Sequence, residues 1–592
     1  MKNRGSSFWR LTKHVFLTTM RKAPLAFAAY ALVAVACSLF DAANTVFKQR
    51  FFDAVEATLG NGTVTKAVTA GVIMGFFMVL EIVLDASSQI LEKNCFRRVQ
   101  GFMGLNLNRK AARIDPVVFE DNHTLDQINK AYQGLEASAE VVSAVFHILF
   151  MNIPFFIFFG GYLFNVKPML LVMMVISFIP SIFGAAIRYR LYAKMENNAA
   201  PYRRRYEYYG RCIHDREYAK ETRLLGGFSY FYRLFRESIA MVSQLSWKTA
   251  RKTELTEIAL NLIVLTGYTA TMAMLFYYLI NGEVGIGIFA AVLSSIDHMF
   301  DMIERMLNYR LGVALQKLGM AENYMSFLSL PERGGFEHEM KSESFSLKKA
   351  SFAYPSADAN ALTEITLDIA KGETIAIVGE NGAGKSTLVR LITGIYLPTS
   401  GDVLVDGVNT KDISAKSVYG GISAVFQRFQ RYKMTVAENV SISDSKSNPS
   451  NENVKNALHK AEFPLENESL TNGFDTMLGR DFGGIDLSGG QWQRLSIARG
   501  FYRAHNMIVL DEPTAAIDPI EESRIYNKFT EISKGKTAII VTHRLGSAKI
   551  ADRIVVMESG RIVETGTHEG LIENCGLYAK MYNAQAQWYT AV

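Results

Sequence analysis

The stretch GENGAGKST, residues 379–387, decides the fold of the second half of the chain. It follows the strand-like residues 374–378 and precedes the helix-like residues 388–392. Glycines at this spacing let backbone N–H groups turn inward around phosphate oxygens at the start of a helix. Lys385 is then placed to reach the β- and γ-phosphates of a nucleotide, and Ser386 to ligate magnesium. The pattern predicts an α/β P-loop fold.

A second feature of the same half is the apolar run 507–510, which ends in Asp511 and Glu512. An acid at such a strand tip can hold magnesium through water, and the next acid can polarise an attacking water molecule. A solvated strand end is the alternative interpretation for this pair taken alone. The P-loop in the same chain favours the catalytic interpretation.

The pentapeptide LSGGQ lies between these two features, at residues 487–491. It is the signature of the ATP-binding cassette family, which the chain therefore resembles. Ser488 is also expected to cap a helix whose first N–H groups face a phosphate. In that family the phosphate belongs to ATP held by the opposite cassette. The resemblance thus implies ATP sites shared between two chains or halves.

Four further residues match family motifs in order. Tyr354 matches the aromatic residue that stacks on adenine, and Gln427 matches the residue that touches magnesium and water. Asp518 matches the loop that links the two sites of a dimer. His543 matches the histidine that contacts the γ-phosphate beside the catalytic carboxylate.

The resemblance implies a full set of site residues. The expected catalytic residues are Glu512, His543 and Gln427, and the expected Mg²⁺ ligands are Ser386, Gln427 and Asp511. The expected ATP-binding residues are Tyr354, Gly379, Glu380, Asn381, Gly382, Ala383, Gly384, Lys385, Ser386 and Thr387. The expected contacts to ATP of the opposite cassette are Leu487, Ser488, Gly489, Gly490 and Gln491.

The composition of the whole chain points to a membrane protein. Of its 592 residues, 49% are hydrophobic and only 20% are charged, which is less charge than soluble proteins typically carry. The four cysteines are far apart and show no metal-ligand spacing, so neither a disulfide framework nor a structural zinc site is expected. A net charge of +6 is too small for this length to predict a nucleic-acid partner.

Long apolar runs fill the first 330 or so residues, and a helix of about 20 residues is enough to cross a membrane. We expect six spans, at residues 24–40, 67–84, 141–164, 168–187, 258–280 and 284–300. A buried core helix is the alternative for each, above all for the two runs that contain Glu81 and Asp297. Charged residues at membrane depth are candidates for function. Those in or near the spans are Asp41, Glu81, Asp85, His147, Asp297, His298 and Asp301.

The positions of the basic residues predict the topology. Arg and Lys are dense before the first span and between residues 188 and 252, which places both termini in the cytoplasm by the positive-inside rule. Residues 1–22 suit an amphipathic helix on the inner surface of the membrane, with a transit peptide as the alternative. The connections 93–135 and 188–256 should be helices that extend the spans inward, with breaks at Asp115-Pro116 and at Gly226-Gly227.

These features predict a multidomain protein with an all-α transmembrane domain of six helices, of the exporter type, and an α/β P-loop NTPase cassette with a helical subdomain. The expected parts are an amphipathic segment at 1–22, a transmembrane domain at 23–328, a linker at 329–342 and the cassette at 343–592. The order of parts resembles an exporter-type half-transporter. Segments near 116–127 and 217–227 match the family's coupling helices. Arg480-Asp481 departs from the Glu-Arg-Gly variant of many multidrug exporters.

We therefore expect an ATP-driven transporter with ATP and Mg²⁺ as cofactors, in a bacterial inner membrane. It would export a peptide, drug-like or lipid cargo as a dimer. A homodimer is favoured because every catalytic element is intact, and a sister half-transporter is the alternative partner. Two other functions stay open at this point: a siderophore or metal-chelate importer with the exporter fold, and a cassette ATPase that does not transport.

Overall fold

The computed structural model describes residues 2–59, 63–355, 357–444, 450–464, 470, 472–512 and 519–590. Its contacts divide the chain into two compact units. The first unit comprises Met1–Ala111 and Asp126–Leu330, and the second comprises Ala112–Leu125 and Pro331–Val592. The expected boundaries placed 112–125 with the membrane helices, whereas the structure packs this segment with the second unit.

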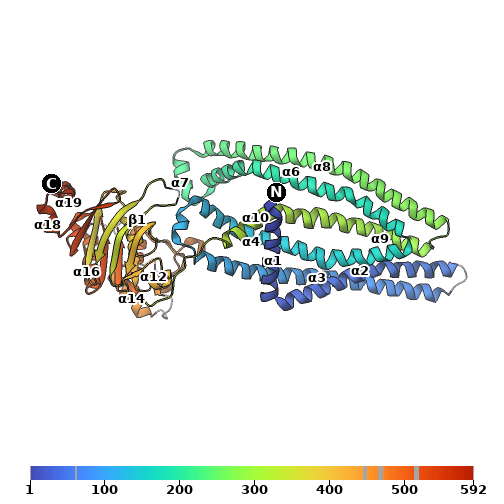
Figure 1. Cartoon of the computed structure of the whole chain (residues 1–592), viewed down its shortest axis with the longest axis horizontal. Coiled ribbons are helices and arrows are strands. Elements are labelled where there is room, and N and C mark those ends of the chain that lie inside the picture. Colours follow the sequence, from blue (N-terminus) through green and yellow to red (C-terminus); the bar gives the residue numbers. More distant parts are fainter. Residues whose placement is uncertain are drawn as a thin grey trace. The chain divides into compact units, whose positions relative to one another are not determined.

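The first unit is helical throughout its described residues, and α6 and α8 run side by side in it (Figure 1). Its α-helices are α1 (Lys2–Lys22), α2 (Pro24–Leu59), α3 (Val64–Ala111), α4 (Asn122–His147), α5 (Ile153–Val166), α6 (Pro168–His214), α7 (Arg216–Leu224), α8 (Phe228–Ile280), α9 (Ile286–Glu304) and α10 (Gly312–Leu328). Two short π-helical segments, η2 (Ile148–Asn152) and η3 (Arg305–Leu311), join α4 to α5 and α9 to α10.

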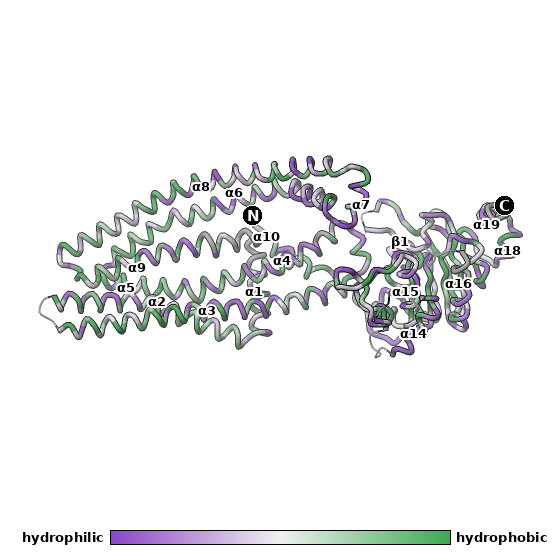
Figure 2. The backbone as a smooth tube through the Cα atoms, turned by 180° about the vertical axis from the view of Figure 1, so that it is seen from behind, coloured by the Kyte–Doolittle hydropathy of each residue, from purple (hydrophilic) through white to green (hydrophobic). Residues whose placement is uncertain are grey.

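Six helical stretches of this unit are long and apolar enough to cross a membrane, as the sequence predicted. For α3 the structure favours a span over a buried core helix, because no residue in its most apolar window is buried. Its exposed side chains include Val72, Phe76 and Val79. An apolar face of this size is unfavourable in water and stable in lipid. Figure 2 shows the hydrophobic stretches of these helices and the hydrophilic ends of α6 and α8 next to α7.

The helices extend well past the apolar runs and end at the predicted breaks. The helix α3 ends at Ala111, and Asp115 then caps the short 3₁₀ helix η1 (Pro116–Glu120) by accepting a hydrogen bond from the Val117 amide. On the other connection, α7 ends at Leu224 and α8 begins at Phe228. Gly226 lies between them with φ +64°, a conformation that favours glycine.

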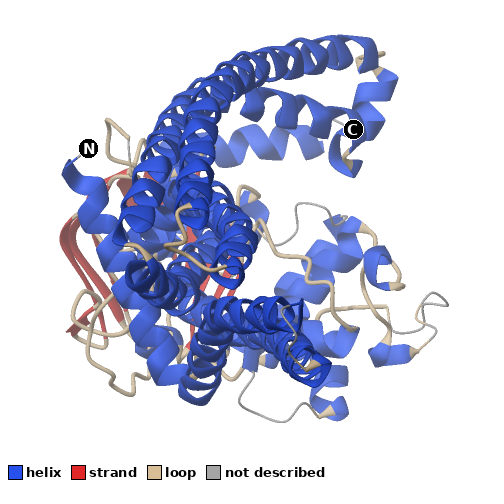
Figure 3. Cartoon of the chain, turned by 90° about the vertical axis from the view of Figure 1, so that its right-hand side faces the viewer, coloured by secondary structure: helices blue, strands red, loops and turns tan. Residues whose placement is uncertain are grey.

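The second unit contains two sheets (Figure 3). An antiparallel sheet has the order β2-β1-β4-β5, formed by β1 (Phe345–Phe352), β2 (Leu362–Ile369), β4 (Ser400–Val405) and β5 (Val408–Asn409). The larger sheet has the order β10-β9-β3-β8-β7-β6 and is parallel except for β10. Its strands are β3 (Thr374–Gly379), β6 (Ile422–Val425), β7 (Met507–Asp511), β8 (Thr537–Val541), β9 (Arg553–Glu558) and β10 (Arg561–Gly566).

Helices complete the second unit on both sides of this sheet. One apolar core joins residues of the two sheets with α11 (Lys385–Ile392). A second core joins strands β6, β7 and β8 with α13 (Val436–Ser441), α14 (Asn451–Lys460), α15 (Gly489–Tyr502) and α16 (Pro519–Ser533). The remaining α-helices are α12 (Ala415–Tyr419), α17 (Leu545–Ala548), α18 (His568–Glu573) and α19 (Leu577–Thr590). This is the predicted α/β cassette with its helical subdomain.

Candidate functional site

The P-loop runs from the end of β3 to the start of α11, and its glycines are required by its backbone. Gly382 and Gly384 have φ of +86° and +98°, values that L side chains rarely adopt. A Cβ atom on Gly379 would lie 2.3 Å from the Met557 carbonyl oxygen on β9. The loop therefore passes too close to the sheet for any other residue at this position.

The side chain of Lys385 is buried inside this loop. Its Nζ donates hydrogen bonds to the carbonyl oxygens of Gly379 at 2.9 Å and Glu380 at 3.0 Å. It also lies 4.0 Å from Oε1 of Glu512. Burial lowers the pKa of Lys385 below its ordinary value, although Glu512 and Asp511 oppose the shift. A positive charge is thus held where the loop amides converge, as phosphate binding requires.

The two acids at the end of β7 are both placed next to the P-loop. Asp511 is buried and accepts a hydrogen bond of 3.2 Å from the hydroxyl of Ser386. Burial, with the charge of Glu512 beside it, raises the pKa of Asp511. Both oxygen atoms suit Mg²⁺, a hard cation that prefers oxygen ligands. Among the described residues no group of three or more His, Cys, Asp or Glu side chains could hold a metal ion.

Glu512 is the centre of a second set of contacts. Its Oε2 accepts a hydrogen bond of 2.7 Å from the Gln427 amide, and its Oε1 lies 3.6 Å from Nδ1 of His543. Its backbone has φ +48°, in the left-handed region that is unfavourable for any residue with a side chain. Strain of this kind persists only where the surrounding structure enforces it, and it is concentrated at functional sites.

Tyr354 lies beside the P-loop, with its hydroxyl 3.0 Å from Oγ1 of Thr387 and accepting a hydrogen bond of 3.0 Å from Arg390. Its ring packs edge-on against Phe352 and Tyr396. The structure thus brings together six of the predicted site residues or groups: Tyr354, the P-loop, Gln427, Asp511, Glu512 and His543. Asp518 lies outside the described residues.

The signature residues 487–491 form a separate structure. Ser488 caps α15 in a capping box, in which its hydroxyl accepts from the Gln491 amide and the Gln491 side chain accepts from the Ser488 amide. Leu487 is buried, whereas a Cβ atom on Gly489 would meet no atom within 4 Å. Among the described residues no hydrogen bond or ion pair joins the signature to the P-loop. The start of α15 is therefore open.

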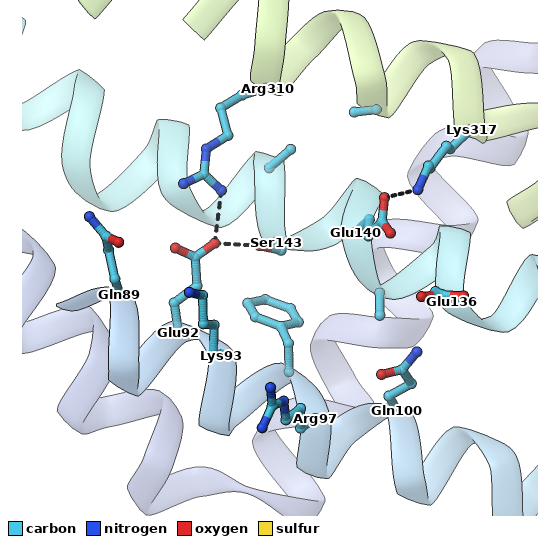
Figure 4. Close-up of a pocket in the computed structure, with 14 residues that line it drawn as sticks. Gln89, Glu92, Lys93, Arg97, Gln100, Glu136, Glu140, Ser143, Arg310 and Lys317 are labelled. Carbon is cyan, nitrogen blue, oxygen red and sulfur yellow. Dashed lines mark hydrogen bonds and ion pairs between the residues drawn. The ribbon is translucent and has the colours of Figure 1, made fainter. Parts of the chain in front are cut away.

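The helical unit holds charged cavities of its own. The larger one, about 800 Å³, is lined by residues of α3, α4, η3 and α10. Glu92 is buried there, accepts a hydrogen bond of 3.0 Å from Arg310, and also contacts the hydroxyl of Ser143 (Figure 4). On the other side of this cavity Lys317 forms an ion pair with Glu140.

A second cavity of about 400 Å³ shares Gln89 and Arg310 with the first. It gathers five of the seven charged or titratable residues that the sequence placed in or near the spans: Asp41, Glu81, Asp85, His147 and His298. Asp41 lies 2.9 Å from Nε2 of His298. The other two are elsewhere: Asp297 accepts a hydrogen bond of 2.6 Å from Tyr268, and Asp301 is exposed.

Comparison with known proteins identifies the second unit. The family model described as "ABC transporter" matches residues 362–515, which include the P-loop, the signature and the acids at the end of β7. The second unit therefore contains an ABC transporter domain.

Three relatives match a part of the chain. The subtilin transport ATP-binding protein SpaT of Bacillus subtilis is 41% identical over 40% of this chain and 38% of its own length. The nisin transport ATP-binding protein NisT of Lactococcus lactis subsp. lactis is 37% identical over 40% and 39%. An ATP-dependent lipid A-core flippase of Chromobacterium violaceum is 35% identical over 52% of each chain. The chain thus matches about half or less of the length of these relatives.

A solved structure extends the likeness in fold beyond the ABC cassette. The structure of a bacterial Atm1-family ABC exporter with ATP bound superposes with a TM-score of 0.77 and 21% sequence identity. The match covers 94% of this chain and 99% of the other. The chain therefore has the exporter-type fold, with six candidate spans followed by one ABC cassette.

Three residues near the site carry no motif and were missed by sequence reasoning. Gln585 on α19 donates a hydrogen bond to the carbonyl oxygen of His543 and accepts one of 2.9 Å from the Leu545 amide. Arg390 donates hydrogen bonds to the hydroxyls of both Tyr354 and Tyr396, and the ring of Tyr396 packs edge-on against that of Tyr354. The sequence does contain a signal for Arg390: it is the charged residue in the otherwise apolar stretch LVRLI, residues 388–392, at the end of the P-loop helix.

Proposed function

We propose that this chain is one half of an ATP-driven exporter, in which two ABC cassettes share two ATP sites and drive two sets of six membrane helices. The observation that carries the proposal is the position of Glu512. It stands at the end of β7 in contact with Gln427, His543 and the P-loop lysine, in a chain with the exporter fold. A carboxylate held in this way can act as the general base for water attack on ATP.

Each residue of the cassette has a role in this chemistry. Lys385 exchanges its two carbonyl partners for the β- and γ-phosphates when ATP enters the P-loop. Ser386 and Asp511, with Gln427, would hold Mg²⁺, which neutralises charge on the phosphates. Glu512 orients and polarises the attacking water, and His543 contacts the γ-phosphate beside it. Tyr354 supports the adenine ring.

The signature supports a dimer. Its open helix start presents N–H groups that can bind phosphate, and its own P-loop makes no described contact with it. A second cassette would complete each site, and closure of the two cassettes would then move the membrane helices from inward-facing to outward-facing. We favour a second copy of this chain as the partner, since P-loop, signature, Glu512 and His543 are all present. A sister half-transporter is the alternative.

The cargo we propose is a peptide, a drug-like molecule or a lipid, moved across a bacterial inner membrane with both termini in the cytoplasm. The names of the relatives refer to subtilin, nisin and lipid A, but each match covers only about half or less of the relative. Support for a polar or charged cargo comes from the cavities that contain Glu92, Arg310, Asp41 and Glu81.

Inside-out vesicles from cells that express this chain alone test the proposal. Wild type, Glu512→Gln and the control Glu558→Gln are fed a cell extract with Mg²⁺ and ATP, and the vesicle contents are analysed by mass spectrometry. Glu558 is an exposed acid at the end of another strand of the same sheet. A compound that accumulates in wild type and in the control, but not in Glu512→Gln, supports export by a homodimer.

Other outcomes point to other functions. ATP hydrolysis without accumulation, together with uptake into right-side-out vesicles, would favour the importer. No hydrolysis by the chain alone would indicate a missing sister chain. Hydrolysis without transport in either orientation would overturn the transporter.

A further inference from the structure

A chain of polar contacts within the second unit joins the segment 112–125 to the nucleotide site. This segment connects two candidate membrane-spanning helices and contains η1. Val117 of η1 packs against the apolar core beneath the P-loop. Glu120, the last residue of η1, accepts a hydrogen bond from the hydroxyl of Tyr396. The segment is thus tied to the cassette by both apolar and polar contacts.

Arg390 is the next member of the chain of contacts. Its Nη1 lies 3.9 Å from Oε1 of Glu120 and donates hydrogen bonds to the hydroxyls of Tyr396 at 3.3 Å and Tyr354 at 3.0 Å. Its guanidinium also lies over the ring of Tyr396, 5.4 Å from the centroid. Arg390 lies on α11, the helix that follows the P-loop. A change in the position of Arg390 would therefore also move the loop proposed to bind phosphate.

The last member is Tyr354, whose hydroxyl is held from two sides. Arg390 donates to it, and Thr387 of the P-loop lies 3.0 Å away. Thr387 is buried, and the stacked rings of Phe352 and Tyr396 border the tyrosine. The orientation of the Tyr354 ring, the surface proposed to support adenine, therefore depends on both the P-loop and Arg390.

Because Glu120 is charged, we expect it to have the largest influence on the position of the Arg390 side chain. Among the described residues it is the acid within ion-pair distance of Arg390, and hydrogen bonds with an ionised partner are about twice as strong as neutral ones. Movement of 112–125 away from the cassette would remove this carboxylate from Arg390 and Tyr396 together. Among the described residues, two neutral hydroxyls and the ring of Tyr396 would then hold the guanidinium.

We propose that Glu120, Tyr396 and Arg390 are positioning residues that couple the segment between α3 and α4 to ATP affinity in the cassette of the same chain. This inference rests on the proposed function, since it assumes that Tyr354 and the P-loop bind ATP. With Glu120 engaged, Tyr354 and Thr387 are held ready for the nucleotide. Such coupling is reciprocal, so ATP binding in turn favours the engaged position of 112–125.

Three variants of the full chain in lipid nanodiscs test this coupling. Glu120→Ala removes the charge and the acceptor, Glu120→Gln keeps an acceptor for Tyr396 but no charge, and Glu337→Gln is the control because Glu337 forms an exposed pair with Lys416. We expect Glu120→Ala to raise KM for ATP about fivefold or more, with a smaller rise for Glu120→Gln. We expect kcat at saturating ATP to stay within about twofold, because the catalytic groups are untouched.

The readouts separate positioning from a loss of structure. Binding of trinitrophenyl-ATP should weaken in parallel with KM, and melting of the Glu120 variants should match the control. A double-mutant cycle with Tyr354→Phe, which removes only the hydroxyl, should show that Glu120→Ala adds no further loss. Additive losses, or an unchanged KM in Glu120→Ala, would overturn the coupling.

The two proposals fail in different ways. A wild-type chain that neither hydrolyses ATP nor binds the fluorescent nucleotide refutes the proposed function, and the coupling with it. A wild-type chain that does both, with Glu120→Ala equal to wild type, refutes the coupling alone. If hydrolysis is absent because a sister chain is missing, the affinities of wild type and Glu120→Ala for the fluorescent nucleotide still test the coupling.

Discussion

The two halves of the proposed ATP site, the P-loop group and the signature, are built in opposite ways. The P-loop group is a network of side chains, in which Lys385, Glu512, Gln427 and His543 are each within contact of another member. The signature is held by a local helix cap, and Gly489 faces open space. The difference indicates that the first half is complete in one chain, whereas the second is a surface prepared for a ligand carried by another cassette.

The largest expected effect comes from the centre of the P-loop group. Glu512→Gln should lower ATP turnover at least about 100-fold, the lower range for loss of a general base. The amide can still contact Gln427 and His543, so ATP binding should persist and the closed dimer should accumulate. Phosphate release and nucleotide binding measure the two effects, with Glu558→Gln as the control. Turnover at the wild-type rate would refute the role of Glu512 as base.

The next effect concerns the signature. Gly489→Asp should leave folding intact, because no atom lies within 4 Å of the new Cβ position. The acid should nevertheless repel the phosphate of the partner's ATP and reduce turnover about tenfold or more, a loss of about 1.4 kcal/mol or more of transition-state stabilisation. Gly319→Asp, at another glycine with open space around it, serves as the control for melting temperature. Full activity in Gly489→Asp would contradict a shared site.

A mixture of two inactive chains sharpens the comparison further. Lys385→Ala removes the P-loop cation, and Gly489→Asp blocks the signature. In a mixed dimer one ATP site receives both lesions and the other receives neither, so partial turnover should return when the two chains are co-expressed and purified through different tags. If each site lay within a single chain, every site would carry one lesion and the mixture would stay inactive.

The smallest expected effect is on the free energy of unfolding. It concerns the segment that connects the helix of the signature to the strand of the P-loop group. His505 lies between α15, which begins at the signature, and β7, which ends at Asp511. It contacts the Arg503 carbonyl oxygen at 2.6 Å and Nζ of Lys536 at 3.3 Å, and burial lowers its pKa to about 4. The unfolded chain, with an ordinary histidine pKa of about 6.5, takes up this proton more readily.

Stability from His505 is therefore fully present above about pH 6.5 and is lost as the pH falls towards about 4. At pH 5.5 the loss from this one group is about 1.4 kcal/mol. His505→Gln should reduce the difference between urea midpoints measured at pH 7.5 and pH 5.5 by tryptophan fluorescence. An exposed histidine, His338, gives the control His338→Gln. An equal pH dependence in both variants would contradict a neutral buried His505.

Sequence patterns predicted the features that depend on local order. The P-loop conformation follows from glycine spacing, the cap of α15 follows from Ser488 three residues before Gln491, and the six spans follow from apolar length. Features that depend on distant partners were out of reach. Glu120 and Tyr396 are 276 positions apart, and neither belongs to a motif. The likeness of 112–125 to a coupling segment gave its position along the chain but not the residues it would meet.

The same separation has a consequence for the order in which the protein is made. A ribosome delivers 112–125 long before β1 or the P-loop helix, and chains generally fold from the N-terminus as they emerge. The tip of the α3–α4 connection must therefore wait, without its partners Arg390 and Tyr396, until these residues have been synthesised. Even then β3 cannot complete its sheet before β8, which pairs Thr374 with Ala538, has left the ribosome. Nascent chains thus have the candidate membrane-spanning helices before they have a cassette, and the proposed ATP hydrolysis cannot start before the last third of the cassette is complete.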